Sequence, residues 1–193
     1  SLTIPALLIL GGVGFTVIVD LVRHRRWRKL KLHSKLMLVM TPALLLLGTL
    51  MFWLLEHNNP GTFGNADLSG QLLAAFFQSA TARTAGFNTI DIGQMVPASL
   101  LFMMMLMFIG AGATSTGGGI KVTTFAVVLL ATRAFLTKRP HVTAYGRTLS
   151  PQIVTRSLAI IIVSTMVLML AMFLLMLTES HSFDKIMFET VSA

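Results

Sequence analysis

Long apolar runs separated by short basic stretches constrain this sequence more than any other feature. The stretch Leu36–Leu55, for example, is almost free of polar side chains. A run of about 20 such residues is what an α-helix needs to cross roughly 30 Å of hydrocarbon. The chain is 54% hydrophobic and 11% charged, whereas a soluble domain carries roughly 25% charged residues. The sequence therefore predicts an all-α integral membrane protein.

Four apolar stretches are predicted to cross the membrane, and two shorter ones are not. The predicted crossings are Leu2–Val19, Leu36–Leu55, Val96–Phe135 and Leu158–Leu177. Pro42 is expected to kink the second crossing, which neighbouring helices can accommodate. Gln71–Ala80 and Phe183–Ala193 are too short to span the bilayer, so we expect re-entrant or interfacial helices there.

The third stretch is too long for one straight helix. As a helix, Val96–Phe135 would be about 60 Å long, roughly twice the hydrocarbon thickness. Two crossings would place the Lys138-Arg139 loop on the wrong side by the positive-inside rule. We therefore predict one interrupted crossing, in which Val96–Ile109 descends, Gly110–Gly119 is irregular and a second helix continues to the cytoplasm.

Charge sorts to two sides under this topology. The net charge is +8, and seven of the 15 Lys and Arg residues lie in the short loop 23–35. Together with the basic loop 137–157 it is predicted to be cytoplasmic, in a multi-pass protein of the plasma membrane. This placement argues against nucleic acid as a partner. Only Asp20 falls on the inner side; the predicted outer acidic residues are Glu56, Asp67, Asp91, Glu179, Asp184 and Glu189, which would concentrate cations.

A repeated unit is visible at low resolution. Residues 36–136 contain one complete order of span, short pore-type helix, filter-like turn and broken span. Residues 1–22 are interpreted as the closing span of the preceding unit, and 158–193 as the first span and pore helix of the next. The sequence lacks an initial methionine and stops within an unfinished segment, so we expect it to be part of a longer polypeptide. Related units around an axis are a common way to line a pore.

The turn after the short helix Gln71–Ala80 is a candidate selectivity filter. Its residues Thr84-Ala85-Gly86-Phe87-Asn88 compare position by position with the Thr-Val-Gly-Tyr-Gly loop of potassium channels. Glycine permits backbone angles that aim successive carbonyls the same way, as is needed to replace the water around a cation. An ordinary interfacial turn with Gly86 as a helix cap is the alternative.

Arg83 requires a separate interpretation, because an arginine facing the conduction axis would repel cations. We expect only its carbonyl to contribute to the filter and its guanidinium to act as a structural brace, in preference to direct ion contact. A charge inside the membrane is costly without a partner, and Glu189 or Asp91 could pair with it.

The small-residue run 110–119 is a candidate gate. It resembles a phosphate loop only superficially, because Gly118 stands where a Walker lysine is needed and no strand precedes it. Non-helical backbone at membrane depth is tolerated where it is buried in protein or lines a water-filled cavity. A flexible stretch beneath a filter is therefore a gate, or alternatively a passive hinge between two half-helices.

Other chemistry has little support in the sequence. There are no cysteines, so disulfides and thiolate catalysis are excluded. The run Met103–Met105 is typical of adaptable helix packing. No Ser-His-Asp or paired-carboxylate arrangement emerges, so we do not expect an enzyme.

Three segments together resemble the potassium transporter superfamily of the bacterial Trk and Ktr membrane subunits and the plant HKT proteins. They are the filter run Ser79–Asn88, the run Ala113–Lys121, and Gly11–Phe15 near the start. The tail Tyr145–Thr148 after the broken span is closer to the Ktr-type subunit (KtrB-like). The resemblance extends over essentially the whole chain.

The resemblance implies four span–pore helix–span repeats around one pore, of which this chain would hold the end of the second, the whole third and the start of the fourth. K+ would be bound through filter carbonyls only, at Arg83, Thr84, Ala85 and Gly86. The gate loop would comprise Gly110, Gly112, Thr114, Ser115, Thr116, Gly117, Gly118 and Gly119. The resemblance also implies no bound cofactor, Na+ as a coupling or activating ion, a homodimer, and a cytosolic nucleotide-binding regulatory ring of the KtrA or TrkA type.

Two other readings remain open from the sequence. A secondary transporter of another fold would place its substrate site at 110–119 and make Gly86 incidental. An intramembrane enzyme or a scaffold subunit without transport is the second.

Overall fold

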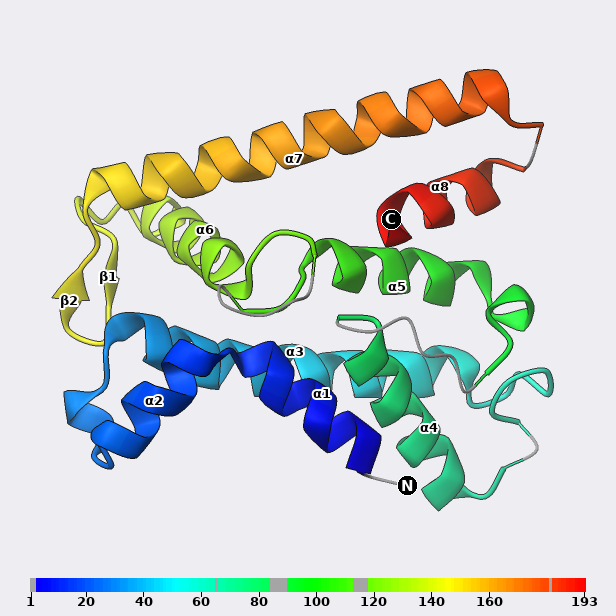
Figure 1. Ribbon diagram of the computed structural model, residues 1–193, viewed down its shortest axis with the longest axis horizontal. Helices are drawn as coiled ribbons and strands as arrows, with labels where there is room; N and C mark the ends of the chain where they lie inside the picture. The colour runs from blue at the N-terminus through cyan, green and yellow to red at the C-terminus, as the bar shows by residue number, and fades with distance from the viewer. Residues whose placement is uncertain (1–2, 65, 84–89, 113–117, 181) are drawn as a thin grey trace.

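The computed structural model describes residues 3–64, 66–83, 90–112, 118–180 and 182–193, which form helices and one small hairpin (Figure 1). In chain order the elements are α1 Thr3–Val13, α2 Phe15–Arg23, the 3-10 helix η1 Trp27–Lys29, α3 Leu32–Glu56, α4 Leu68–Thr81, the 3-10 helix η2 Ile92–Gln94, α5 Pro97–Phe108, α6 Val122–Leu136, β1 Thr143–Ala144, β2 Arg147–Thr148, α7 Pro151–Thr178 and α8 Phe183–Ser192.

The hydropathy pattern located most of these helices correctly. Among the described residues, α3 and α7 are long and apolar enough to cross a membrane, and α1 with α2 would be a third crossing if they count as one bent span. The predicted interruption of Val96–Phe135 is confirmed, since α5 ends at Phe108 and α6 begins at Val122. Helix α7 begins at Pro151, earlier than the predicted start at Leu158, because proline is well suited to the first turn of a helix.

The predicted crossing Leu2–Val19 is not one straight helix. The chain turns through 81° between α1 and α2. The turn lies at Gly14, whose φ of 86° and ψ of 145° belong to a region open almost only to glycine. Val17 N–H donates to the Gly14 carbonyl at 3.2 Å, which starts the second helix in its new direction.

Helix α3 is the centre of the assembly and contacts α1, α2, α4, α5 and α6. Its closest neighbour is α4, which crosses it at Gly48. A Cβ on Gly48 would overlap the Ser79 hydroxyl and lie 3.1 Å from the Leu106 side chain. The Ser79 hydroxyl donates to the Leu45 carbonyl at 2.9 Å. Small residues that allow such close approach are how helices pack in membranes.

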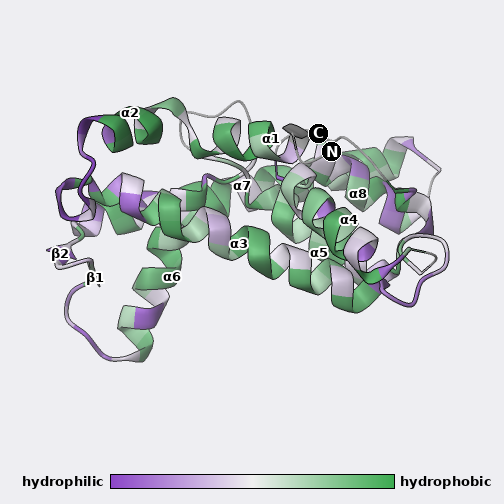
Figure 2. Ribbon diagram, turned by 90° about the horizontal axis from the view of Figure 1, so that it is seen from below, coloured by the Kyte–Doolittle hydropathy of each residue, from purple (hydrophilic) through white to green (hydrophobic). Residues whose placement is uncertain are grey.

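Polar residues gather at two ends of the helical body. Figure 2 shows apolar helices between hydrophilic loops, and in Figure 1 the α2–α3 connection and the hairpin share one end while the α3–α4 connection and η2 share the other. The hairpin has a two-residue turn with positive φ at Tyr145 and Gly146, the geometry that suits strand twist. Trp27 packs edge-on against Tyr145, with ring centroids 6.2 Å apart, so the two basic loops contact each other.

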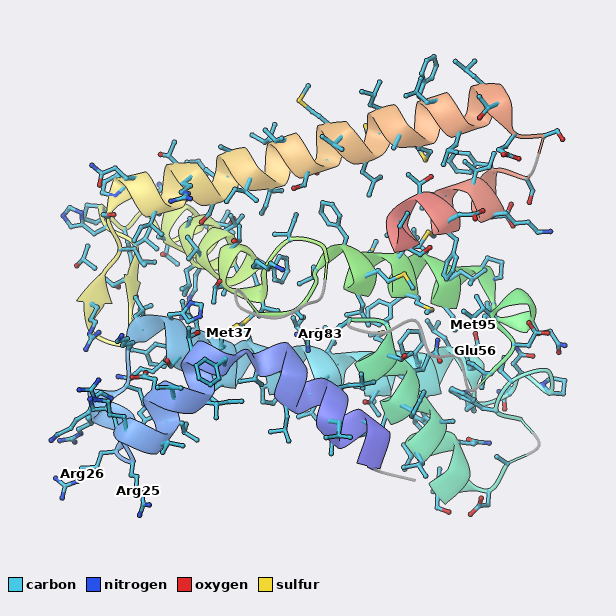
Figure 3. The ribbon with its side chains drawn as sticks, in the orientation of Figure 1. Arg25, Arg26, Met37, Glu56, Arg83 and Met95 are labelled. Atoms are coloured by element: carbon cyan, nitrogen blue, oxygen red, sulfur yellow. The ribbon has the colours of Figure 1, made fainter. Side chains whose placement is uncertain are left out.

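Asp20 explains why one carboxylate lies at the basic end. Its side chain is buried and accepts hydrogen bonds from Ser34 Oγ at 2.5 Å, Lys31 N at 3.0 Å and His24 Nδ1 at 3.1 Å. These contacts connect the end of α2 to the start of α3. The loop between them therefore has a fixed base from which Arg25 and Arg26 project outward (Figure 3).

The close approach at Gly48 can be tested by a compensating pair of substitutions. Gly48→Ala should lower the free energy of unfolding by about 1–3 kcal/mol, because the added methyl group overlaps Ser79 Oγ. Adding Ser79→Ala removes that atom, so the double variant should be less destabilised than Gly48→Ala alone. Thermal unfolding of the full-length protein in detergent measures both. Equal unfolding temperatures for all three proteins would contradict the packing described here.

Candidate functional site

The candidate site combines the end of α4 with the two arms of the break between α5 and α6. The described residues include Arg83, Gly110, Gly112, Gly118 and Gly119. The other predicted filter residues, Thr84, Ala85 and Gly86, and the loop residues Thr114, Ser115, Thr116 and Gly117 lie outside the described residues. The structure therefore describes the residues on either side of the predicted filter and gate loop.

Helix α4 is held at both ends. Asp67 caps its start, where its carboxylate accepts hydrogen bonds from Ser69 Oγ and from Gly70 N. These bonds, that from Ser69 first, lower the pKa of Asp67 below its ordinary value. The residues of its last turn, from Gln78 to Thr81, are buried. At 14 residues the helix is only about 21 Å long. It therefore ends in the interior of the protein.

Arg83 follows this buried end and is only 8% exposed. Its Nη1 donates to the Thr41 carbonyl of α3 at 3.3 Å. Figure 3 places it where α4 meets α3. The side chain also borders a small cavity of about 10 Å³ whose other walls include Leu8 and Gly12 of α1.

The suggested ion pair of Arg83 with Glu189 or Asp91 is wrong. Within the described ranges no carboxylate oxygen lies within 4.0 Å of the guanidinium. A helix carbonyl takes the place of a carboxylate. The sequence could not reveal this acceptor, because every residue carries a carbonyl.

The break between α5 and α6 is closed at its base by backbone contacts. Ile120 N donates to the Phe108 carbonyl at 2.8 Å and Val122 N to the Ala111 carbonyl at 3.4 Å. A Cβ on Gly110 would overlap the Gly118 carbonyl oxygen. Gly119 has φ +72°, and a Cβ there would lie 2.7 Å from the Met107 carbonyl oxygen. The two ends of the loop therefore lie against each other, and side chains at these glycines have no room.

A second set of contacts attaches this loop to the bend between α1 and α2. Gly112 N donates to the Gly12 carbonyl at 2.8 Å. A Cβ on Gly112 would be 2.7 Å from that oxygen, 2.9 Å from the Val13 carbonyl oxygen and 2.7 Å from Met37 Cε. Two interrupted helices thus meet backbone to backbone.

Glu56 organises the opposite end of the helices, whereas the sequence placed it only among the predicted outer acidic residues. Its side chain is fully buried. Oε2 accepts from Asn59 Nδ2 and Thr62 Oγ1, both at 2.7 Å, and Oε1 accepts from Val96 N at 2.9 Å. The carboxylate therefore fixes the α3–α4 connection to the start of α5 (Figure 3). Asn and Thr spaced closely after a helix-terminal Glu were the available signal.

The described part of the chain contains no group of three His, Asp or Glu residues that could hold a metal ion. Its polar contacts involve backbone groups and small side chains near helix breaks.

Fold and site together define an all-α integral membrane protein whose irregular backbone is enclosed by helices. The model of the TrkH family, described as cation transport protein, matches residues 2–193. The chain belongs to this family.

The similar proteins agree with this assignment. The chain is 59% identical to the Ktr system potassium uptake protein B of Vibrio alginolyticus and 42% identical to the protein of the same name from Bacillus subtilis (strain 168), in each case over 100% of this chain and 43% of the relative. The crystal structure of the potassium transporter TrkH from Vibrio parahaemolyticus superposes with a TM-score of 0.72 at 20% identity, covering 90% of this chain and 38% of that one.

The chain thus spans less than half the length of these curated relatives. The predicted resemblance to the Trk and Ktr proteins is confirmed, and the transporter of another fold is excluded by the family match and the superposition. The expectation that the chain is not an enzyme is confirmed at the level of the family, which is one of cation transport proteins.

The role of Glu56 can be tested with Glu56→Gln, which keeps the shape but replaces one acceptor oxygen by a donor. At least one of its three donors then loses its partner, and bonds to a charged group contribute about 1.5–3 kcal/mol each. The unfolding temperature of the full-length protein should fall. Glu189→Gln, the same change at an exposed side chain, is the matched control and should leave it unchanged. A similar effect of both changes would contradict the assigned role.

Proposed function

We propose that this chain is part of a membrane-embedded potassium translocation subunit, with a selectivity-filter turn at 83–88 and an intramembrane gate loop at 110–119. The observation that carries the proposal is the short helix α4, which ends at Thr81 inside the protein instead of crossing the bilayer. The buried Arg83 follows this end. Irregular backbone at that depth is expected only where it lines a cavity or is buried. Two of the similar proteins are named potassium uptake proteins, which supports K+ as the ion.

The filter proposal assigns K+ to the carbonyls of Arg83, Thr84, Ala85 and Gly86. It is supported by the direction of the Arg83 side chain, which donates to Thr41 of α3 and so acts as a brace. The C-terminal end of a helix carries partial negative charge, which favours a cation beyond it. The α4 end at Thr81 supplies that field in front of the proposed turn.

The gate proposal assigns the loop 110–119 a movable role and not that of a passive hinge. A hinge needs two half-helices that can swing, whereas here the loop ends are hydrogen-bonded across the break and to a third segment, α1. These contacts restrain the two half-helices and so argue against a hinge at the loop ends. Open and closed positions of such a loop would control passage below the filter.

We also propose a membrane orientation and partners for the chain. We place the basic loops 23–35 and 137–157 in the cytoplasm, which is supported by their contact through Trp27 and Tyr145. A homodimer and a cytosolic nucleotide-binding ring facing these loops complete the assembly, with Na+ as a coupling or activating ion.

The ion assignment is tested by uptake. The full-length protein should restore K+ uptake in a host that lacks its own transport, and Gly86→Ser should reduce the preference for K+ over Na+, because serine disfavours the backbone angles that aim filter carbonyls. Rubidium and sodium fluxes into these cells measure the preference. Unchanged preference in Gly86→Ser, with confirmed expression, would remove the filter from the proposal. No uptake by the expressed parent protein would remove the function itself.

The gate is tested by a substitution in the loop and a control outside it. Gly110→Ala forces the arms apart, because its methyl group overlaps the Gly118 carbonyl. If closure loses about 1.4 kcal/mol, the ratio of open to closed states rises about tenfold. Uptake by the membrane subunit without its regulatory partner should rise accordingly. Gly11→Ala, which lies outside the loop and whose Cβ would meet nothing within 4 Å, is the control and should match the parent protein. Equal fluxes for the two variants would contradict a gate at this loop.

A further inference from the structure

The bend between α1 and α2 contacts the loop 110–119 at Gly112. The proposed filter and gate do not explain why the chain bends there. The sequence predicts a membrane crossing here, and the chain turns through 81° within it. Nothing in crossing a bilayer requires such a turn. The bend contacts the break between α5 and α6, so the two interruptions can act together.

The bend supplies a hydrogen-bond acceptor that a straight helix would not offer. In a continuous helix the carbonyl of Gly12 would accept from the amide four residues later. Here α1 ends at Val13, and α2 begins anew with the amides of Val17 and Ile18 donating to the Gly14 carbonyl, at 3.2 and 3.4 Å. The Gly12 carbonyl accepts from Gly112 N at 2.8 Å. The acceptor for the loop thus depends on the turn at Gly14.

The fit around Gly112 is tight on three sides. Two are backbone, the carbonyl oxygens of Gly12 and Val13 at 2.7 and 2.9 Å from a Cβ placed on Gly112. The third is Met37 Cε of α3 at 2.7 Å from the same point. Met37 is fully buried and packs with Val17 of α2. It therefore contacts both the loop and the helix after the bend (Figure 3).

We propose that Gly12, Gly14 and Met37 form a clamp that positions the α5 arm of the loop at Gly112, and that straightening of the chain at Gly14 releases this arm. The proposal rests on the gate proposed for 110–119. It adds a controlling element outside the loop: the closed position is set by α1 and α2. Because Gly12 also borders the cavity beside Arg83, the clamp lies between the proposed filter and the proposed gate.

Gly14→Ala tests the clamp, since alanine disfavours φ 86° and favours a continuous helix. K+ uptake by the full-length membrane subunit without its regulatory partner should rise about fivefold to tenfold, within the usual range for coupled conformational states. Gly11→Ala is the matched control. A Cβ at Gly11 meets nothing within 4 Å and the residue is helical, so its uptake should equal that of the parent protein.

A labelling measurement reports the loop itself. Ala111 is fully buried, so Ala111→Cys should react slowly with a small thiol reagent in the parent background. Together with Gly14→Ala it should react several-fold faster, as read by mass spectrometry of the peptide that contains residue 111.

Should Gly14→Ala fail to accumulate, Met37→Ala takes its place, with Met37→Leu as the variant that keeps the contact. It should raise both uptake and labelling, and Met37→Leu should not.

The outcomes separate this proposal from the gate on which it rests. Higher uptake and faster labelling in Gly14→Ala, or in Met37→Ala, support the clamp. Raised uptake in Gly110→Ala together with parental uptake and labelling in the clamp variants would overturn the clamp and keep the gate. Parental uptake in Gly110→Ala would overturn the gate, and the clamp with it.

Discussion

Backbone amides and carbonyls inside a bilayer have no water to bind, and this constraint governs every irregular part of the chain. Each unpaired group in hydrocarbon costs several kcal/mol, so a helix can stop only where another segment supplies partners. The break between α5 and α6 meets this requirement in two ways. Ile120 bonds across the break to Phe108, and Gly112 bonds outward to Gly12. The second bond requires an acceptor from another interrupted helix. Two helix breaks therefore satisfy each other.

Contacts of this kind demand the absence of side chains. A Cβ at Gly110 would meet the Gly118 carbonyl oxygen of the same loop, one at Gly119 would meet carbonyl oxygens at the end of α5, and one at Gly112 would meet the bend in α1–α2. Backbone packing thus explains Gly110, Gly112 and Gly119, whereas a Cβ on Gly118 would meet nothing within 4 Å. In the α5 arm, Gly110 and Gly112 are buried against backbone carbonyls, so the abundance of glycine does not by itself indicate flexibility.

The elements that follow from hydropathy and length were predictable, because those properties are summed over many residues. The sequence predicted α3, the short α4 and the interruption after α5 with their approximate bounds. The bend at Gly14 was missed because glycine within an apolar run has no effect on hydropathy, and only the backbone angles distinguish a bend from a straight helix. Glu56 was predicted only as an outer acidic residue, because its burial depends on donors from residues up to 40 positions away, such as Val96.

Arg83 shows how a single cation is accommodated beside a proposed cation pathway. A carboxylate partner would have neutralised it, at the cost of burying a second charge. A carbonyl partner at Thr41 needs no second charge and draws the guanidinium toward α3. Arg83 also lies just beyond the C-terminal end of α4, where the helix dipole favours positive charge. Under the proposed function, the same helix end must also attract K+. Because the Arg83 guanidinium is held on the α3 side by Thr41, its charge acts from that side, whereas the last carbonyls of α4 point along the axis of that helix. The pairing with a neutral group thus sets where the charge of Arg83 acts.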